Sequence, residues 1–238
     1  MIIEGAISIK AAINAGNRKV DKVYINRDKK TKDFNYLRKI IKNNNIELVE
    51  STKDDLDKIA LGKTYGGILA EVSNRYMNDF DDSDIFFLDG IEDPFNLGYA
   101  CRTLYAFGVK NVLLSNRDYS NMEAQLLKSS AGAYDLLNIK IVKDSINEVK
   151  EYKDKGYYLY ALYRGDEAKD VFNVKFNNKS LFILGGEKRG ISSQLLDLCD
   201  EYLYIPYGSD FRNALNACGA LDVLATLLFA QRKKWLHP

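Results

Sequence analysis

The alternation of strand-like and helix-like stretches constrains the fold of this chain more than any other feature of its sequence. In the second half, the strand-like stretches are continuous apolar runs, which is typical of parallel strands buried on both faces. The strands expected there are 85–88, 111–115, 139–142, 157–162, 181–184 and 202–205. We therefore predict an α/β fold whose larger part is a mostly parallel sheet covered by helices.

A helix start follows the first of these strands. Asp93 and Pro94 stand where a helix prefers an N-cap acceptor and a proline in its first turn. We predict that this helix runs to about Phe107. Further helices are expected at 122–130, 146–152, 192–199 and 213–235, and the last of them closes the chain.

The first 75 residues form a smaller α/β unit in this interpretation. Its expected helices are 7–15, 34–43 and 53–60, and its expected strands are 22–25, 46–49 and 68–72. A polar segment rich in aspartate follows. The predicted organisation is a domain at 1–75, a linker at 76–84 and a larger domain at 85–238.

Charge is unevenly spread although the net charge of the chain is only +1. Residues 1–75 hold 15 Lys and Arg against 10 Asp and Glu, which leaves a net charge of +5 there and −4 in the remainder. Much of the positive charge lies in one stretch, made of Arg27, Lys29, Lys30, Lys32, Arg38, Lys39 and Lys42. Such a stretch can neutralise RNA phosphates, and it can also be the solvated face of a helix.

The histidine and cysteine content argues against several classes of enzyme. The chain has one histidine, His237, so a Ser-His-Asp triad, a Cys-His pair or a two-histidine metal site is not expected. Cys101, Cys199 and Cys218 are far apart and odd in number, which favours reduced thiols in a cytoplasmic protein. The sequence shows neither a signal-peptide pattern nor an apolar run near the ~20 residues of a membrane span.

Three loops at the carboxyl ends of predicted strands are where a parallel sheet would bind a ligand. They span 91–102, 184–192 and 205–217. The second has the pattern G-G-x-x-x-G, which is not the G-x-G-x-x-G of dinucleotide-binding proteins. Residues Gly62-Lys63-Thr64 look like the end of a phosphate-binding loop, but Asp57 stands where that loop needs a glycine. The loops thus indicate a small ligand without identifying it.

Arg102 lies in an otherwise apolar helical stretch, where its charge needs a partner. Asn96 precedes it by six residues, and we expect the two side chains near one side of the helix. Gly98 between them lowers helix stability and suits a close approach of backbone or ligand. Two kinds of partner fit Arg102 equally: a carboxylate (Glu92 or Glu187) in a structural salt bridge, or a phosphate of a ligand.

Together the three loops resemble the motifs of the SpoU/TrmH branch of the SPOUT methyltransferases. The segment from Asp93 to Arg102 follows D-P-x-N-x-G-x-x-x-R completely. The segment from Gly185 to Ile191 follows G-x-E-x-x-G-[IL], and Ile205-Pro206 is followed by Ala214-Leu215-Asn216, where the family has S-L-N. The resemblance covers most of the chain, and the first 75 residues look like the RNA-binding domain that many members carry.

The resemblance implies an RNA 2′-O-ribose methyltransferase that uses S-adenosylmethionine and no metal. It implies a catalytic domain with a deep trefoil knot and a homodimer whose sites are completed across the interface. Two-domain members usually act on large-subunit ribosomal RNA, which is the substrate expected here. The residues expected around the cofactor are Leu184, Gly185, Gly186, Ile205, Pro206, Leu215, Asn216 and Ala217.

The same resemblance implies roles for four polar side chains. Arg102 would contact the substrate phosphate and stabilise the developing 2′-alkoxide. Asn96 would orient Arg102 or the ribose. Glu187 would position the neighbouring loops or Arg102, and Asn216 would fix the cofactor or the backbone around it.

One position departs from the family pattern. Ala214 replaces the usual serine, which removes a hydroxyl contact worth about 0.5–1.5 kcal/mol. Ser209 or Asn213 is expected to compensate. Gly186, where asparagine is common, is expected to be a milder departure because backbone contacts survive.

Four other interpretations remain open. Ala214 favours a non-catalytic RNA-binding member of the same fold, against which the complete first motif argues. A transfer-RNA 2′-O-methyltransferase has the same motifs. A knotted methyltransferase acting on a base nitrogen is disfavoured by the first motif, and an unrelated nucleotide-binding Rossmann protein by the missing glycine fingerprints.

Overall fold

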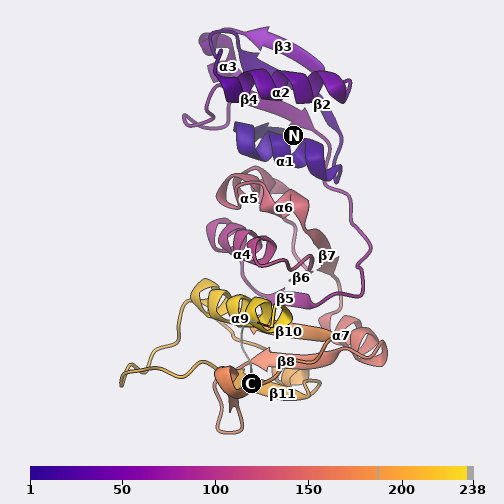
Figure 1. The fold of residues 1–238 in the computed structure, drawn as a ribbon, viewed down its shortest axis with the longest axis vertical. Coiled ribbons are helices and arrows are strands. Elements are labelled where there is room, and N and C mark those ends of the chain that lie inside the picture. Colours follow the sequence, from indigo (N-terminus) through magenta and orange to yellow (C-terminus); the bar gives the residue numbers. More distant parts are fainter. Residues whose placement is uncertain (187, 235–238) are drawn as a thin grey trace. The chain divides into compact units, whose positions relative to one another are not determined.

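A computed structural model describes residues 1–186 and 188–234. Glu187 with its predicted role, His237, and the last residue of the predicted closing helix therefore lie outside the described residues. The chain forms two compact units, which are described separately (Figure 1). One is made by residues 1–77 together with 119–136, and the other by 78–118 together with the residues from 137 onward. In the described residues, no helix is long and apolar enough to cross a membrane.

The first unit contains a four-stranded mixed sheet. Its strand order is β1-β4-β2-β3, in which β4 is antiparallel to both of its neighbours and β2 is parallel to β3. The strands are β1 (Ile2–Glu4), β2 (Val20–Asn26), β3 (Glu47–Ser51) and β4 (Ile68–Val72), and the helices of this segment are α1 (Ala6–Ala15), α2 (Lys32–Asn43) and α3 (Lys53–Ile59). Strand β1 is missing from the sequence prediction because three residues are too few to show an alternating pattern.

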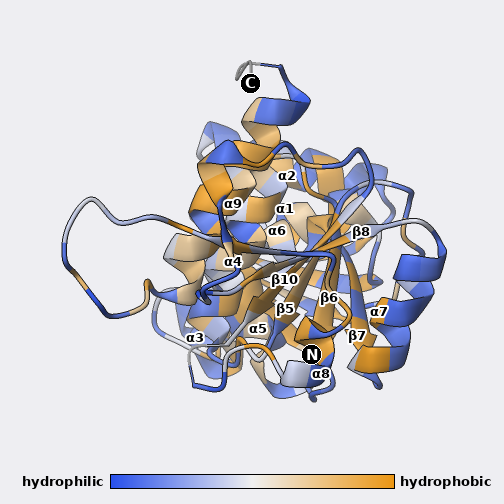
Figure 2. Ribbon diagram, turned by 90° about the horizontal axis from the view of Figure 1, so that it is seen from below, coloured by the Kyte–Doolittle hydropathy of each residue, from blue (hydrophilic) through white to orange (hydrophobic). Residues whose placement is uncertain are grey.

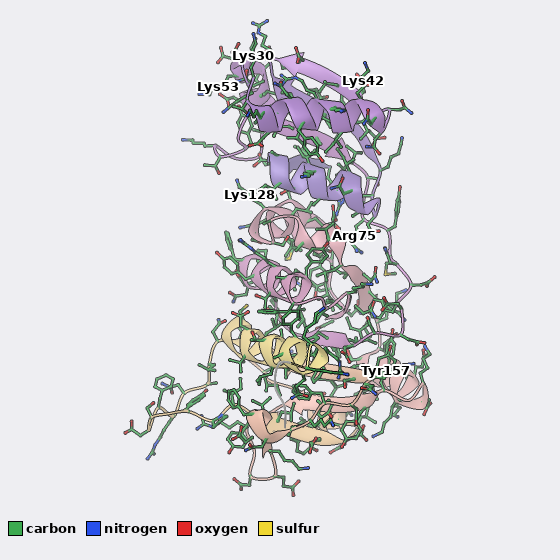
Figure 3. The ribbon with its side chains drawn as sticks, in the orientation of Figure 1. Lys30, Lys42, Lys53, Arg75, Lys128 and Tyr157 are labelled. Atoms are coloured by element: carbon green, nitrogen blue, oxygen red, sulfur yellow. The ribbon has the colours of Figure 1, made fainter. Side chains whose placement is uncertain are left out.

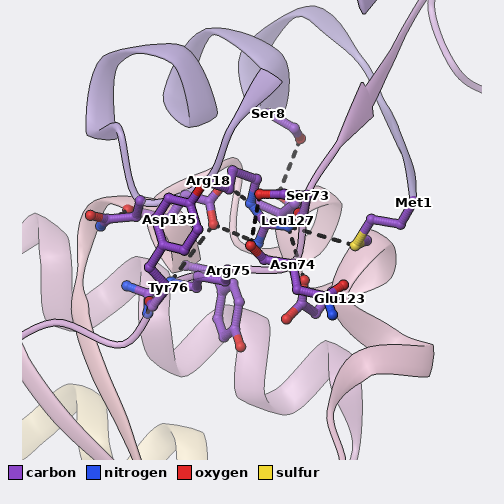
Figure 4. Close-up of polar contacts among 12 residues, drawn as sticks. Met1, Ser8, Arg18, Ser73, Asn74, Arg75, Tyr76, Glu123, Leu127 and Asp135 are labelled. Atoms are coloured by element: carbon purple, nitrogen blue, oxygen red, sulfur yellow. Dashed lines mark hydrogen bonds and ion pairs between the residues drawn. The ribbon is translucent and has the colours of Figure 1, made fainter. Parts of the chain in front are cut away.

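Two short helices from the middle of the chain complete this unit. They are α5 (Glu123–Ser129) and α6 (Ala133–Leu136), and α6 packs against α1. Gly132 fits against α1 because a Cβ there would lie 2.4 Å from the Cβ of Ala11. The segment also supplies the carboxylates of a buried ion network, in which Arg18 contacts Asp135 at 2.8 Å and Glu123 at 2.9 Å (Figure 4).

The second unit is built on a seven-stranded parallel sheet, as the continuous apolar runs predict. Its order is β7-β6-β5-β10-β8-β11-β9. The strands are β5 (Ile85–Asp89), β6 (Asn111–Ser115), β7 (Asn138–Val142), β8 (Tyr158–Leu162), β9 (Lys169–Asp170), β10 (Ser180–Gly185) and β11 (Glu201–Tyr204). Its α-helices are α4 (Pro94–Ala106), α7 (Ser145–Asp154), α8 (Ser193–Leu196) and α9 (Ala217–Arg232).

Helices cover both faces of this sheet. Residues Ile85, Phe87, Leu181 and Ile183 point to one face, where they pack with Val149 of α7 and neighbouring side chains. Alternation turns Phe86, Leu88 and Phe182 to the other face, and all three are buried. Figure 2 shows the apolar strands between α7 on one side and α4 with α9 on the other. The α/β fold class is confirmed, and the trefoil knot stays a prediction.

The limits of two helices position the functional loops. Helix α4 begins as predicted, because the Asp93 carboxylate accepts hydrogen bonds from the backbone N–H groups of Phe95 and Asn96. The predicted start of the closing helix at Asn213 is wrong. Helix α9 begins at Ala217, because the Asn216 side chain caps it by accepting a hydrogen bond from the N–H of Cys218 at 2.8 Å.

The aspartate-rich segment before β5 is anchored at its end to the second unit. The two oxygens of Asp84 receive a bidentate contact from Arg232 at 2.8 Å each. Asp81 accepts a hydrogen bond from the amide of Asn111 at 2.8 Å. The predicted boundaries of the linker stay a prediction, but these acidic residues have structural partners that the composition did not indicate.

Candidate functional site

The carboxyl ends of β8, β10 and β11 surround a cavity of about 590 Å³, here called the glycine cavity. Most of its lining comes from three strand ends and the residues that follow them: 162–164 at β8, 184–186 with 190–191 at β10, and 203–205 with 207 at β11. The loop before α9 and the first turn of α9 complete it. Seven of the eight predicted cofactor residues line this cavity, namely Leu184, Gly185, Gly186, Ile205, Leu215, Asn216 and Ala217. The eighth, Pro206, is not among the lining residues.

The two glycines at the end of β10 allow backbone segments to meet where a side chain has no room. A Cβ at Gly186 would lie 2.1 Å from the carbonyl oxygen of Gly90, and one at Gly185 would lie 2.3 Å from the carbonyl carbon of Gly190. The N–H of Gly186 also donates to the carbonyl oxygen of Asp89 at 2.6 Å. Neither glycine has a positive φ, so close approach and not backbone conformation requires them. The packing around residue 186 therefore requires glycine in this chain. The expectation that glycine here is only a mild departure from the family pattern did not include this steric requirement.

The loop between β11 and α9 lies against the glycine cavity through a cation–aromatic contact. Figure 1 shows this loop projecting from the second unit. The Arg164 guanidinium lies 4.8 Å from the centre of the Tyr207 ring and donates a hydrogen bond to the carbonyl oxygen of Arg212 at 3.2 Å. The Tyr207 hydroxyl accepts from the N–H of Leu215 at 2.9 Å. These contacts fix the backbone of the third motif beside the cavity.

Sequence reasoning missed Tyr163, Arg164 and Tyr207 as lining residues. The signal was available, since Tyr163 and Arg164 directly follow β8, the strand between β10 and β11 in the sheet. Ala214 lines the cavity, whereas Ser209 and Asn213 do not. The Ser209 hydroxyl instead accepts a hydrogen bond from the N–H of Phe211. The expected compensation for the missing serine is therefore not seen among these lining residues.

A second cavity, of about 620 Å³, adjoins the first and is here called the Asp89 cavity. It is lined by Asp89, Gly90, Ile91, Glu92, Asp93, Asn96, Ser115, Gly186, Lys188, Arg189, Gly190, Ser192 and Ala217. Gly186, Gly190 and Ala217 also line the glycine cavity, so the two cavities share a wall. The lining combines the carboxyl ends of β5 and β6 with the start of α4 and the loop after β10.

Asn96 is held at the Asp89 cavity by the packing of α4 against α9. The thiol of Cys218 donates a hydrogen bond to the carbonyl oxygen of Asn96 at 3.1 Å. This contact gives Cys218 a structural role. The Cys199 thiol donates to the carbonyl oxygen of Leu195 at 3.2 Å, and burial raises the pKa of this thiol to about 12, which disfavours the thiolate that a nucleophile needs. The three cysteines are free thiols, as the sequence predicts.

Arg102 lies apart from both cavities. Six residues along a helix turn a side chain by about 120° relative to Asn96, so the expectation that both lie near one side is wrong. Arg102 is exposed, on a face of α4 that also exposes Phe95, Tyr99 and Tyr105 to between 42% and 53%. Among the described residues it has neither a hydrogen bond nor an ion pair. A salt bridge to Glu92 is not formed, because Glu92 faces Arg117 at 3.6 Å.

The predicted basic stretch is exposed on the first unit, with one exception. Arg27, Lys29, Lys30, Lys32, Lys39 and Lys42 are exposed, and Figure 3 shows Lys30 and Lys42 near opposite ends of α2. Arg38 is partly buried, where it pairs with Glu50 at 2.8 Å and donates to the carbonyl oxygen of Lys29. Six of these seven residues are thus accessible to an RNA, and Arg38 supports the loop that carries Lys29.

Comparison with known proteins places both parts of the chain among RNA-modifying enzymes. The model of the SpoU rRNA methylase family matches residues 84–226, and that of the RNA 2′-O ribose methyltransferase substrate-binding domain matches residues 2–77. A protein described as a TrmH family tRNA/rRNA methyltransferase from Staphylococcus aureus is 28% identical over 97% of this chain and 96% of its own length.

Solved structures show the same fold at lower identity. The SpoU methyltransferase AviRb from Streptomyces viridochromogenes is similar to 99% of this chain and 90% of its own, with a TM-score of 0.80 and 20% identity. An rRNA methyltransferase from Sinorhizobium meliloti is similar to 99% of this chain and 88% of its own, with a TM-score of 0.78 and 16% identity. AviRb has also been solved in complex with the cofactor AdoMet.

Proposed function

Because this chain belongs to the SpoU rRNA methylase family, we propose that it transfers a methyl group from S-adenosylmethionine to a ribose 2′-hydroxyl of large-subunit ribosomal RNA. The observation that carries this proposal is the pair of adjoining cavities with Gly186, Gly190 and Ala217 between them. A methyl transfer needs two binding sites that meet at the reacting atoms, since most of the acceleration comes from positioning.

The glycine cavity fits S-adenosylmethionine. Its volume of about 590 Å³ is that of a small-molecule site, and backbone around Leu184, Gly186, Ile205 and Leu215 offers N–H and carbonyl groups to an adenine and a ribose. The absence of a Cβ at Gly185 and Gly186 keeps this backbone close to its neighbours. When bound, the cofactor supplies a methyl group attached to a sulfonium sulfur. After transfer of this methyl group, the rest of the cofactor is a neutral thioether, which is a good leaving group without protonation by an acid.

The Asp89 cavity then receives the target nucleotide. Asn96 of the first motif lines it, and its amide can donate to or accept from a ribose hydroxyl. A ribose bound in this cavity would lie next to the glycine cavity, at the wall that the two cavities share. The chain thus holds the nucleophile in position, and what remains is to stabilise the charge that develops on the 2′-oxygen.

Arg102 from the other subunit of a homodimer supplies the positive charge that stabilises the developing alkoxide. It stands between exposed aromatic side chains on α4 and lines neither cavity of its own chain, which suits a helix face that packs on a second copy. In a two-fold symmetric dimer, the same face of each chain contacts the other, so each Arg102 can serve the partner's site. A guanidinium is a planar cation whose N–H donors suit contact with a phosphate or an alkoxide.

The substrate-binding unit supports an RNA substrate. The match of residues 2–77 to a substrate-binding domain coincides with the excess positive charge of the first 75 residues. Six exposed basic side chains of the basic stretch can contact phosphates without reading the sequence. They would contribute affinity that weakens as salt concentration rises.

Transfer of labelled methyl groups to unmodified ribosomal RNA and transfer RNA tests the proposal. A 2′-O-methyl group blocks alkaline cleavage, so label is expected in alkali-resistant dinucleotides of the ribosomal RNA. Arg102→Ala is expected to reduce this label by about 10²–10³-fold. Label only in transfer RNA would correct the substrate, and label in alkali-sensitive mononucleotides would reject 2′-O chemistry. Cofactor binding without transfer to either RNA would favour a non-catalytic RNA-binding protein, with Ala214 as the first residue to revert to serine.

A further inference from the structure

Asp89 presents a carboxylate to the Asp89 cavity with part of its hydrogen-bonding capacity unused. It is the last residue of β5 and is partly buried. Its Oδ1 accepts a hydrogen bond from the Ser115 hydroxyl at 3.0 Å, and its Oδ2 has no partner among the described residues. An ionised carboxylate accepts up to about four hydrogen bonds and donates none. A group of this kind is costly to bury, and burial raises its pKa.

Ser115 holds this carboxylate in one orientation. Its hydroxyl oxygen accepts a hydrogen bond from the N–H of Gly90 at 2.8 Å, which fixes the oxygen next to the end of β5. The hydroxyl proton is then available to Asp89 or to the carbonyl oxygen of Leu88 at 3.3 Å. The two side chains come from the ends of neighbouring parallel strands, β5 and β6, so their positions are set by the sheet.

The other two carboxylates among the described lining residues already have structural partners. Asp93 caps α4 through two backbone N–H groups, and Glu92 pairs with Arg117. Asp89 has a side-chain hydroxyl as its partner and no cation among the described residues. It is therefore the acidic group of this cavity best placed to receive donors from a ligand.

The rest of the lining matches the other parts of a nucleotide. Exposed Lys188 and Arg189 can contact a phosphate, and the wall shared with the glycine cavity is where the ribose must lie for methyl transfer. Asp89, at the end of β5, belongs to the same lining and can face the base of that nucleotide. The volume of about 620 Å³ accommodates a whole nucleotide.

We propose that Asp89, oriented by Ser115, makes this cavity selective for guanosine, by accepting hydrogen bonds from N1–H and N2–H of the target base. Guanine is the RNA base whose Watson–Crick edge places two N–H donors side by side. Adenine and cytosine each pair one donor with a ring nitrogen acceptor, and uracil flanks its N3–H with two carbonyl oxygens that a carboxylate repels. Enzymes that act on an extruded nucleotide commonly read this edge of the base.

The first test identifies the methylated nucleoside. This inference rests on the proposed 2′-O-methyl transfer, so unmodified ribosomal and transfer RNA are methylated with the full-length protein and digested to nucleosides. The expected product is 2′-O-methylguanosine. If 2′-O-methyladenosine, -cytidine or -uridine forms instead, the guanosine inference is overturned while the proposed function stands. If no 2′-O-methyl nucleoside forms, both fail.

The second test asks whether Asp89 reads the base. Asp89→Asn is expected to lower kcat/KM for RNA by about 10- to 100-fold, the range for losing one bidentate contact to a base, with an unchanged Kd for S-adenosylmethionine. Asp154→Asn also replaces an aspartate by asparagine, at an exposed position of α7 that lines neither cavity, and is the matched control, expected to stay within about twofold of wild type. A loss of similar size in both variants would mean that the loss of a negative charge in general, and not base recognition, is responsible.

Inosine separates recognition from a structural effect. Inosine lacks the N2 amino group of guanosine, so a short RNA with inosine at the mapped position should lower kcat/KM of the wild-type enzyme about tenfold. In Asp89→Asn the same replacement should cause little further loss, because the contact is already absent. Equal losses in both enzymes, or no loss in the wild type, would contradict a contact between Asp89 and N2–H.

Discussion

At the scale of single residues, Gly186 shows how a cofactor site can be defined by a missing atom. A Cβ added at Gly186 would lie 2.1 Å from the carbonyl oxygen and 2.6 Å from the carbonyl carbon of Gly90. Backbone cannot rotate away as the end of a flexible side chain can. The sequence motif pointed to this glycine, but the reason for it needed the position of Gly90, about a hundred residues earlier in the chain.

Gly186→Ala is therefore expected to disturb both cavities. Forcing the strands apart by this methyl group should cost about 1–3 kcal/mol of unfolding free energy, measured by denaturant titration, and should weaken S-adenosylmethionine binding, measured by calorimetry. Gly208→Ala is the control, because a Cβ there has no atom within 4 Å and the φ is not positive. If Gly186→Ala binds the cofactor like wild type, the shared wall does not depend on this contact.

The partly buried carboxylate of Asp89 is expected to destabilise the folded protein, although the same carboxylate is proposed to bind the substrate. Burial raises its pKa above the ordinary value of 3.8, although the hydrogen bond from Ser115 lowers it again in part. The native state thus keeps the proton to a higher pH than the unfolded chain, so the free energy of unfolding falls as the pH rises between the two pKa values. Asp89→Asn is expected to unfold at a higher Tm than wild type at pH 7.

The difference in Tm between Asp89→Asn and wild type should shrink as the pH is lowered toward the ordinary pKa of aspartate, where the native and the unfolded wild-type protein both hold the proton. Thermal unfolding of both proteins between pH 4 and pH 8 checks this dependence. An advantage that stays constant over this range would show that burial of the charge is not its cause. Loss of activity together with a gain in Tm would be the signature of a residue kept for binding.

At the scale of helices, strands and loops, prediction from the sequence worked where the pattern is local. The strands at 68–72 and 111–115 have the predicted bounds, and the Asp93 cap begins α4. Prediction failed at the start of α9, where Asn216 caps the helix and residues 206–216 remain a loop. Helix-forming residues such as Ala214 and Leu215 could not reveal that Tyr207 and Arg164 hold this segment against the cavity.

Tyr207→Phe tests whether the loop at 206–216 supports cofactor binding. The change keeps a ring for the Arg164 contact and removes the hydroxyl that accepts from the N–H of Leu215. Losing one hydrogen bond of about 0.5–1.5 kcal/mol should raise the Kd for S-adenosylmethionine by about two- to tenfold. Tyr36→Phe removes the hydroxyl of an exposed tyrosine on α2 that lines neither cavity and is expected to leave the Kd unchanged. Equal effects of the two changes would argue against this role of the loop.

The buried ion network in the first unit is a feature that no local pattern could predict. Arg18 is 3% exposed, and its partners Glu123 and Asp135 lie more than a hundred residues away in the chain. Arg75 adds a second cation 3.8 Å from Asp135 and 5.6 Å from the centre of the Tyr134 ring. These contacts hold the segment 119–136 in the first unit, although the family model for the second part of the chain includes it.

Arg18→Ala should destabilise the protein strongly, because it leaves buried Asp135 with less of its compensating charge. The expected loss of unfolding free energy is about 3–5 kcal/mol, measured by urea titration. Lys19→Ala removes the neighbouring cation, whose ion pair with Asp21 is exposed, and should have no measurable effect. A small loss for Arg18→Ala would show that Arg75 or water compensates Asp135.

At the scale of the whole molecule, the position of Arg102 separates two ways of building the site. If each chain were complete, Arg102 would have to reach its own cavities, although it lines neither and lies on the exposed face of α4. If the homodimer is the active unit, each site takes its cavities from one chain and Arg102 from the other. The sequence resemblance implied such sharing, but the residue pattern alone had suggested the opposite, a common side of the helix for Asn96 and Arg102.

Mixing two inactive variants distinguishes these arrangements. Arg102→Ala lacks the cation, and Ala214→Trp fills the glycine cavity from an exposed loop position. Each variant alone should be inactive. In a sharing dimer, half of the randomly mixed molecules are heterodimers with one intact site each, so co-expression should restore about a quarter of wild-type methyl transfer. In a dimer with self-contained sites, every site carries one defect and the mixture stays inactive. Size-exclusion chromatography of both variants is the control, since loss of the dimer would also abolish complementation. Restored activity would therefore show both that the dimer forms and that Arg102 acts on its partner's substrate.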